Sequence, residues 1–303
     1  MNGVLIIDKP AGMTSHDVVN RLRRILGQRA VGHLGTLDPM ATGVLPMVVG
    51  SFTRLAQFYL DSEKMYEGTI RFGVATDTYD AEGEPTSTLQ TVELQRDAVE
   101  SLAGKFRGVV EQMPPPFSAK KIQGVPAYKL ARKHKEVVLK PVQVEVKEFE
   151  ILAVTADRAQ FRARVASGTY MRSIAHDMGQ ALGCGAHLES LRRTGVAEFR
   201  VEDSHTLDGL AATVGKSRVE DSSEFFVHPR RLLPQLPSVT ADEATAARIR
   251  SGRTVNLPDL SRARQVKVFA GQRDLIAIAT RVAGTLFHPK MVLSAQPVTA
   301  SVG

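Results

Sequence analysis

One aspartate is a candidate catalytic group because of the residues on both sides of it. Asp38 lies within the stretch Gly32-His33-Leu34-Gly35-Thr36-Leu37-Asp38-Pro39-Met40-Ala41-Thr42-Gly43. Pro39 restricts the backbone beside Asp38, and the glycines allow the backbone of a ligand to come close. An ionised carboxylate held against a substrate can act as a nucleophile or stabilise positive charge. An isolated Asp-Pro pair, in contrast, more often forms a turn or starts a helix.

The motifs of several other enzyme classes are incomplete or missing. Ser118-Ala119-Lys120-Lys121 matches the S-x-x-K pattern of penicillin-binding enzymes, but the S-D-N and K-T-G motifs of that site do not occur. The sequence has no P-loop, no G-x-G-x-x-G, no G-x-S-x-G and no H-E-x-x-H. Gly183-Cys184-Gly185 with His187 offers too few ligands for a metal ion. Kinase, dehydrogenase, esterase and zinc protease functions therefore lack their usual support.

The composition favours a globular protein with an anionic partner. The 303 residues are 43% hydrophobic, which is enough for a full core, and they carry a formal net charge of +7. Basic side chains gain affinity for nucleic acids by releasing counterions from phosphates, although many basic proteins bind no nucleic acid. No apolar run approaches the length of a membrane span, Met1–Lys9 does not resemble a signal peptide, and the single Cys184 fits a reducing compartment. We therefore expect a cytoplasmic protein.

The segments around Asp38 have clear local signals. Gly3–Pro10 predicts a buried strand that ends at the proline. Thr14 and Asp17 resemble a capping box that starts a helix, and Gly27 can end that helix. The glycines and two prolines of Arg29–Pro46 predict a long irregular loop, which is the kind of segment that often carries function.

The rest of the first two hundred residues predicts a mixture of helices and strands. Strands are expected at Val44–Val49, Tyr66–Phe72, Val137–Val154 and Gln160–Ala166, and helices at Ser51–Leu60, Leu94–Phe106 and Tyr170–Leu182. The polar stretch Thr76–Glu84 is expected to be a turn or loop. This order of elements predicts an α+β main domain.

A projecting basic segment is expected after the three prolines of Met113–Pro116. Phe117–Lys135 combines two aromatic residues with several lysines, an arginine and a histidine, a pairing found in RNA-binding arms. A plain amphipathic hairpin or helix is the alternative. If the segment binds RNA, neutralising its Lys and Arg residues should weaken binding and make its salt dependence shallower.

The C-terminal third predicts a linker followed by a small module. Residues 216–237 contain mixed charge and three prolines, although Phe225, Phe226 and Val227 indicate that part of this segment docks. A helix at Asp242–Arg250 and strands at Val266–Ala270 and Leu275–Val282 are expected in the module. The predicted domains are therefore residues 1–215, a linker at 216–237 and a module at 238–303.

The stretch around Asp38 closely resembles the catalytic loop of the TruB family of pseudouridine synthases, which reads G-H-x-G-x-L-D-P-x-A-T-G-x-L-P. Every fixed position of that pattern is present. Roughly the first two hundred residues carry further matches in the same order, more than chance assembles. They are Gly3-Val4-Leu5-Ile6-Ile7-Asp8-Lys9-Pro10, Lys64-Met65-Tyr66, Thr76-Asp77-Thr78, Pro116-Phe117-Ser118-Ala119 with Lys121, Gly168-Thr169-Tyr170-Met171-Arg172, Gly183-Cys184-Gly185-Ala186-His187-Leu188 and Leu191-Arg192-Arg193.

The resemblance implies a fold, a reaction and a partner. The fold would be a mixed-sheet synthase domain with a thumb-like RNA-binding insertion at about 113–135, followed by a small β-rich module of the PUA type at 238–303. The reaction would convert a uridine to pseudouridine at position 55 in the T loop of tRNA, with no metal and no cofactor. The enzyme would act as a monomer, with no membrane and no obligate protein partner.

The same resemblance assigns roles to six residues. Asp38, Tyr66 and Arg172 would be catalytic: Arg172 would pair with the Asp38 carboxylate and keep it ionised, and Tyr66 would stack on the uracil and take part in a proton transfer. Because the uridine lies stacked in a loop, the enzyme would flip it out, with His33 occupying the vacated stack. The remaining residues that bind the flipped base would be Tyr170 and Leu191. Without the family pattern, the tyrosines and the leucine would more often be core residues.

Two other functions are compatible with parts of the sequence. The first is the catalytic subunit of a guide-RNA-directed pseudouridylation particle, whose sequences are similar around the aspartate. The absence of a long basic tail and the presence of the thumb-like stretch argue against it. The second is a catalytically silent RNA-binding or tRNA-folding protein, which would require Asp38, Tyr66 and Arg172 to be present and idle.

Overall fold

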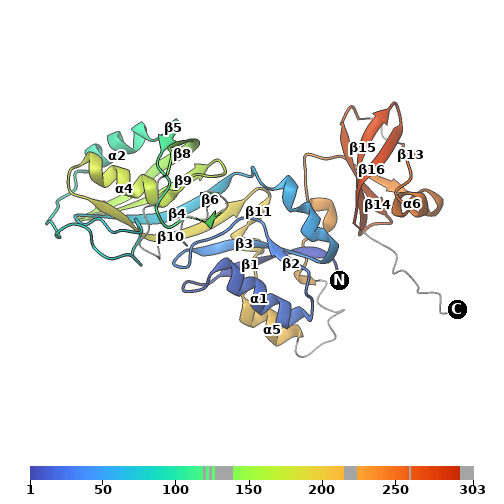
Figure 1. Ribbon diagram of the computed structural model, residues 1–303, viewed down its shortest axis with the longest axis horizontal. Coiled ribbons are helices and arrows are strands. Elements are labelled where there is room, and N and C mark those ends of the chain that lie inside the picture. The colour runs from blue at the N-terminus through green and yellow to red at the C-terminus, as the bar shows by residue number, and fades with distance from the viewer. Residues whose placement is uncertain (119–120, 123–124, 127–138, 215–223, 259–260, 294–303) are drawn as a thin grey trace.

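The computed structural model describes the chain except residues 119–120, 123–124, 127–138, 215–223, 259–260 and 294–303, and it leaves the side chains of 121–122 and 125–126 undescribed (Figure 1). Within the described residues, two β-sheets form the framework. In the same residues, no helix combines the length and the apolar character that crossing a membrane requires.

The larger sheet is mixed, and one interior strand, β10, joins its two halves. Its order is β1-β3-β10-β4-β9-β8-β5, with β2 paired to β3 and β11 paired to β10. Strand β10 runs parallel to β3 and antiparallel to β4. The strands are β1 (Gly3–Lys9), β2 (Val31–His33), β3 (Thr42–Val49), β4 (Lys64–Phe72), β5 (Gly108–Gln112), β8 (Val142–Thr155), β9 (Arg158–Val165), β10 (Ala186–Val196) and β11 (Phe199–Arg200).

The first five residues of strand β1 (Gly3–Lys9), Gly3 to Ile7, are apolar and buried because both faces of the strand are covered. Leu5 and Ile7 belong to a hydrophobic cluster with the helices α1 (Ser15–Leu26), α2 (Arg96–Lys105), α4 (Met171–Ala181) and α5 (Leu207–Val214). Val4 and Ile6 face a second cluster, which includes the 3₁₀ helix η1 (Gly50–Phe58) and residues of the C-terminal module. The four helices therefore pack on one side of the sheet.

The start of α1 follows the predicted capping box. The Thr14 side chain accepts a hydrogen bond from the Asp17 N–H, and the Asp17 carboxylate accepts one from the Thr14 N–H at 2.9 Å. Gly27 ends the helix with a left-handed φ of 60°, a conformation that favours glycine. The predicted helix and its boundaries are confirmed.

Two predicted elements near Asp38 are corrected. The segment Arg29–Pro46 is not irregular throughout, because β2 covers Val31–His33 and β3 begins at Thr42, so the loop between these strands is limited to residues 34–41. Cross-strand pairing with β3 overrides the weak strand propensity of Gly32. The predicted helix at Ser51–Leu60 is a 3₁₀ helix at Gly50–Phe58.

The C-terminal module has a sheet of its own. Its order is β12-β14-β15-β16-β13, and α6 (Glu243–Arg250) is capped by Asp242, which accepts from the Thr245 N–H at 2.7 Å. The strands are β12 (Ser238–Ala241), β13 (Val255–Asn256), β14 (Gln265–Ala270), β15 (Asp274–Ala283) and β16 (Leu286–Val292). The predicted helix and two strands are confirmed, while β12, β13 and β16 were not predicted.

The segment before this module docks on the main sheet, as its aromatic residues indicated. The Val227 N–H donates to the Val4 carbonyl at 2.7 Å, and Phe226 forms a bridge with Leu5. Short 3₁₀ helices occur at η2 (Val201–Asp203) and η4 (Pro229–Arg231). Most of the predicted basic arm lies outside the described residues. Of its described part, β6 (Lys121–Ile122) pairs with β7 (Val125–Pro126).

Candidate active site

The structure brings all six predicted site residues to one pocket. The pocket has a volume of about 300 Å³, and its lining includes His33, Asp38, Tyr66, Tyr170, Arg172 and Leu191. These residues come from β2, the loop at 34–41, β4, α4 with the residue before it, and β10. A volume at the lower end of the range for small-ligand sites suits a single base. Their convergence agrees with the predicted site, whereas their roles remain predictions.

Short hydrogen bonds hold the backbone on both sides of Asp38. Before the aspartate, the Leu37 N–H donates to Ser15 Oγ at 2.9 Å, and Ser15 Oγ donates to the Leu37 carbonyl at 3.1 Å. After it, the Pro39 carbonyl accepts from the Gly12 N–H at 2.9 Å, and the Ala41 N–H donates to the Asp38 carbonyl at 3.1 Å. The loop is therefore fixed by α1 and the turn before it, so little conformational entropy is lost when a substrate binds.

The Lys9 side chain supports the same loop through hydrogen bonds to main-chain carbonyls. Its side chain is fully buried, and Nζ donates to the carbonyls of Pro10 at 2.8 Å, Met13 at 2.6 Å and Pro39 at 3.0 Å. Burial lowers the pKa of Lys9 from 10.5 to about 8, against the opposing effect of Glu82 and Asp38. Because its donors are used by the backbone, Lys9 supports the loop.

The pKa of Lys9 predicts how a Lys9→Met substitution depends on pH. Between pH 8 and 10.5 the unfolded chain binds more protons than the folded chain, so the contribution of Lys9 to stability rises with pH. The free energy of unfolding of the wild type relative to Lys9→Met should therefore increase by roughly 2 kcal/mol from about pH 7.5 to about pH 9.5. Urea unfolding at both pH values measures this difference. Lys105→Met, at an exposed position of α2, is the control, and a pH-independent difference for Lys9→Met would contradict the assignment.

Asp38 and Arg172 form an ion pair at the pocket. Arg172 Nε lies 2.9 Å from Asp38 Oδ2, and Nη2 donates to Oδ1 at 3.2 Å. The guanidinium is also held by the Thr78 and Phe117 carbonyls, each at 3.0 Å, and lies 3.4 Å from the Asp80 carboxylate. The Arg172 side chain is only 5% exposed and that of Asp38 is 36% exposed. The arginine is therefore fixed, while the aspartate keeps a face open to a ligand.

The surroundings of Asp38 have opposing effects on its ionisation. Burial raises the pKa of Asp38, and the nearby Asp80 carboxylate adds to this increase. Arg172 and Lys9 lower the same pKa. A carboxylate that is partly desolvated and kept ionised by a fixed guanidinium is a stronger nucleophile or charge stabiliser than one in water.

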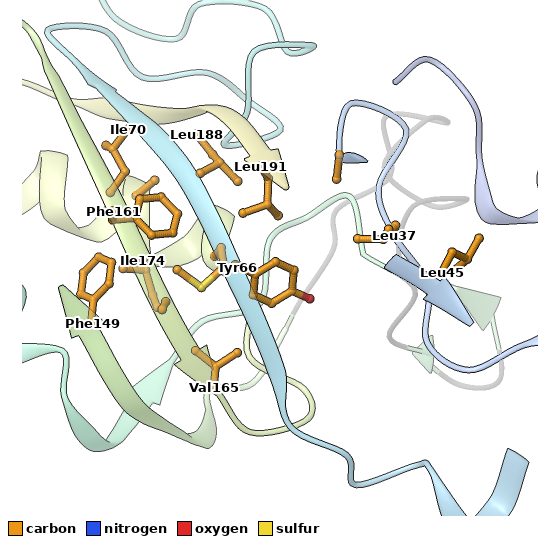
Figure 2. Packing of buried hydrophobic residues seen from close by; sticks show 14 of the residues in the cluster. Leu37, Leu45, Tyr66, Ile70, Phe149, Phe161, Val165, Ile174, Leu188 and Leu191 are labelled. Atoms are coloured by element: carbon orange, nitrogen blue, oxygen red, sulfur yellow. The ribbon is translucent and has the colours of Figure 1, made fainter. Parts of the chain in front are cut away.

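Tyr66 and Leu191 contribute to the apolar part of the pocket. Both residues are only 8% exposed, and they lie on the adjacent strands β4 and β10. Figure 2 shows the Tyr66 hydroxyl pointing away from the aromatic cluster around Phe161, toward the segment that contains Leu37. A base entering the pocket can therefore contact the ring and the leucine while the hydroxyl remains available for a proton transfer.

His33 and Tyr170 lie at the edges of the same pocket. Burial lowers the pKa of His33, so the neutral ring is favoured. The amide of the buried Gln112 fixes the backbone of Tyr170, since its Nε2 donates to the Tyr170 carbonyl at 3.0 Å and its Oε1 accepts from the Tyr170 N–H at 2.8 Å. Burial also raises the pKa of Tyr170, which keeps its hydroxyl protonated.

Three polar residues of the site were not singled out from the sequence. Asp80 contacts Arg172, Lys64 lines the pocket and donates to Ser167 Oγ at 3.1 Å, and Arg193 is fully buried under the Asp38 loop. Lys64 and Arg193 occur within family motifs, which was the available signal for them. Asp80 falls in a stretch that reads only as a polar loop, so nothing local marks it.

The chain is similar to pseudouridine synthases over most of its length. The model of the TruB family pseudouridylate synthase N-terminal domain matches residues 23–171, and that of the tRNA pseudouridylate synthase B C-terminal domain matches residues 172–235. The tRNA pseudouridine synthase B of Solibacter usitatus is 50% identical over 97% of this chain and 100% of its own length. The protein of the same name from Aquifex aeolicus is 38% identical, with the same coverage of 97% and 100%.

The fold is similar to that of solved structures as well. A Cbf5-Nop10-Gar1 complex matches with a TM-score of 0.71 and 26% identity, over 97% of this chain and 85% of the other. An archaeal box H/ACA sRNP Nop10-Cbf5 complex matches with a TM-score of 0.68 and 25% identity, over 97% and 86% of the two chains.

Proposed function

The chain belongs to the TruB family of pseudouridylate synthases, and from that membership we infer that it is an isomerase that converts uridine to pseudouridine in tRNA. The target is the uridine at position 55 of the T loop. One observation carries the site assignment: the Asp38 carboxylate, paired with the fixed Arg172, lies open to a base-sized pocket that Tyr66 and Leu191 also line.

The reaction is an isomerisation in which every atom of the substrate is retained except one exchanged hydrogen. The bond between N1 of uracil and C1′ of ribose breaks, the uracil turns within the pocket, and C5 forms a new bond to C1′. The proton on C5 is lost to solvent, and N1 gains a proton. The chain's own groups must therefore trap the free base and stabilise the cleaved ribose.

Each of the six predicted site residues has its own role in this reaction. Asp38 acts as the nucleophile or stabilises positive charge on the ribose, and Arg172 keeps it ionised and aimed. Tyr66 stacks on the uracil and supports the proton transfer, while Leu191 and Tyr170 contact the flipped nucleotide. His33 fills the space that the uridine leaves in the tRNA loop. No metal or organic cofactor takes part in this proposal.

The enzyme is proposed to act alone, as a cytoplasmic monomer bound to the T stem-loop of tRNA. The relatives named tRNA pseudouridine synthase B cover nearly the whole chain at up to 50% identity, whereas the Cbf5 complexes are about half as similar in sequence. Residues 1–215 form the catalytic domain in this proposal, with the RNA-binding insertion at about 113–135 and a linker at 216–237. The module at 238–303 is a PUA-like RNA-binding domain.

Tritium release tests the reaction and its position together. The protein is mixed with tRNA transcripts labelled with tritium at C5 of uracil, one with the T-loop uridine and one with cytidine in its place. We expect release of the label from that uridine only. Binding of tRNA without any release would favour the RNA-binding alternative, and release from both transcripts would contradict the position.

A further inference from the structure

One buried arginine connects both ends of the Asp38 loop. The Arg193 side chain is fully buried, and its guanidinium donates from Nε to the Val44 carbonyl at 2.8 Å, from Nη1 to Thr36 at 3.1 Å and from Nη2 to Gly35 at 3.0 Å. Gly35 and Thr36 precede Asp38, and Val44 follows the loop in β3. A change at this guanidinium would therefore alter main-chain hydrogen bonds on both sides of Asp38.

The backbone of Arg193 lies directly against Gly43, just after the C-terminal end of the same loop. Arg193 pairs with Gly43 across the parallel β10–β3 register. Gly43 has a left-handed φ of 98°, and a Cβ there would lie 2.2 Å from the Arg193 carbonyl oxygen. Only glycine permits this approach. The position of Arg193 relative to the loop is consequently set by main chain as well as by side chain.

Arg193 also contacts Tyr66, on the opposite neighbouring strand. The two residues are direct cross-strand partners in the antiparallel β10–β4 pair, so their side chains project from the same face. Tyr66 lies close enough to the guanidinium to raise the pKa of Arg193, against the effect of burial. Because a guanidinium can only donate, a polar contact between the two side chains uses the phenol oxygen as the acceptor. Figure 2 shows that the hydroxyl points away from Phe161 and toward the segment that contains Leu37.

Burying a charge at this position is costly. Burial lowers the pKa of Arg193, and the guanidinium in turn lowers the pKa values of His33 and Lys64. Among its neighbours, Asp38 and Tyr66 act in the opposite direction. Replacing a buried charge by a well-packed apolar residue is often neutral or stabilising. A fully buried cation that binds both ends of the Asp38 loop and lies beside Tyr66 therefore points to a role in holding these two groups in place.

We propose that Arg193 is a positioning residue for uridine isomerisation, which fixes Tyr66 relative to the Asp38 loop and directs the Tyr66 hydroxyl hydrogen toward the bound nucleotide. This inference rests on the proposed function. It does not require Arg193 to contact the substrate. The guanidinium acts through Tyr66 and through the carbonyls of the loop.

A double-mutant cycle between Arg193→Lys and Tyr66→Phe tests the connection. The rate of C5 tritium release is measured in single turnover with saturating enzyme, and the Kd for tRNA is measured by filter binding. Groups in one hydrogen-bond network couple by a factor of about three to a hundred. We expect Arg193→Lys to lower the rate at least about tenfold in the wild type but less than about threefold in Tyr66→Phe, with the Kd changed by less than about twofold.

The neighbouring arginine provides a matched control. Arg192 makes a bidentate pair with Asp8 at 2.8 and 3.0 Å, and its side chain is 42% exposed. Arg192→Lys makes the same chemical change one residue away and should leave the rate within about twofold of wild type. Thermal unfolding of each variant monitors the fold, and Arg193→Gln is the second variant at the buried position.

Each remaining outcome bears on one inference only. If the effects of Arg193→Lys and Tyr66→Phe on the rate simply multiply, or if tRNA binding falls in parallel with the rate, the positioning role is wrong. If neither Arg193→Lys nor Arg193→Gln folds, the residue is structural and the proposal is also wrong. A wild-type protein that binds tRNA but releases no tritium would instead overturn the proposed function.

Discussion

Asp38→Asn should bind tRNA with nearly wild-type affinity and form pseudouridine at least about a thousandfold more slowly. Asparagine has the shape of aspartate and can still accept a hydrogen bond from Arg172, which lies within 3.2 Å of the carboxylate. It lacks the negative charge that attacks or stabilises the ribose. Affinity for tRNA arises mainly from contacts with phosphates, so it should survive the substitution.

Single-turnover tritium release and filter binding, measured on the same preparation, test this prediction. Asp97→Asn is the matched control, because Asp97 is an exposed residue in the first turn of α2, outside the pocket lining. Its rate should equal that of the wild type. An Asp38→Asn protein that retains turnover, or that loses binding and turnover together, would contradict the assignment.

Arg172→Lys and Asp80→Asn should move the acid limb of the pH–rate profile in opposite directions. Arg172 lowers the pKa of Asp38 and Asp80 raises it. If Asp38 reacts as the carboxylate, activity is lost as the pH falls through its pKa. Lysine cannot reach both Asp38 oxygens and the Thr78 and Phe117 carbonyls at once. The Arg172→Lys profile should therefore shift to higher pH, with a rate near neutrality roughly a hundredfold lower because the carboxylate is misplaced.

Asp80→Asn removes a charge and keeps the local hydrogen bonds. The Asp80 carboxylate accepts from Thr78 Oγ1 at 2.6 Å and from the Glu82 N–H at 3.1 Å, both of which an asparagine oxygen can replace. Its profile should shift to lower pH. Single-turnover rates from about pH 5 to about pH 8 measure the acid limb of the profile for each of the two variants. Shifts in the same direction would show that the limb reports a group other than Asp38.

The sequence identified the local elements that surround the site because their signals are local. A capping box, a left-handed glycine and a proline act on the backbone within a few residues, so the bounds of α1 were predicted from Thr14, Asp17 and Gly27. The ordered family motifs likewise marked Asp38 and Arg172, although 134 positions separate them. Neither prediction required knowledge of the path of the chain.

The tertiary structure decided which charged residues are buried and what they hold. Lys9, Asp80 and Arg193 are charged residues. Charged side chains are almost never fully buried unless they are paired, so their type alone predicts exposed positions. Lys9 becomes buried because β1 pairs with β3 and its Nζ donates to three main-chain carbonyls. Arg193 becomes buried because β10 pairs with both β3 and β4, and Asp80 because it lies against Arg172 of α4. The pairings of β10 join segments more than a hundred residues apart, and their register depends on the whole sheet. The sequence by itself therefore indicated Asp38 as the candidate catalytic residue and the reaction class, whereas only long-range packing determined the charges that surround Asp38.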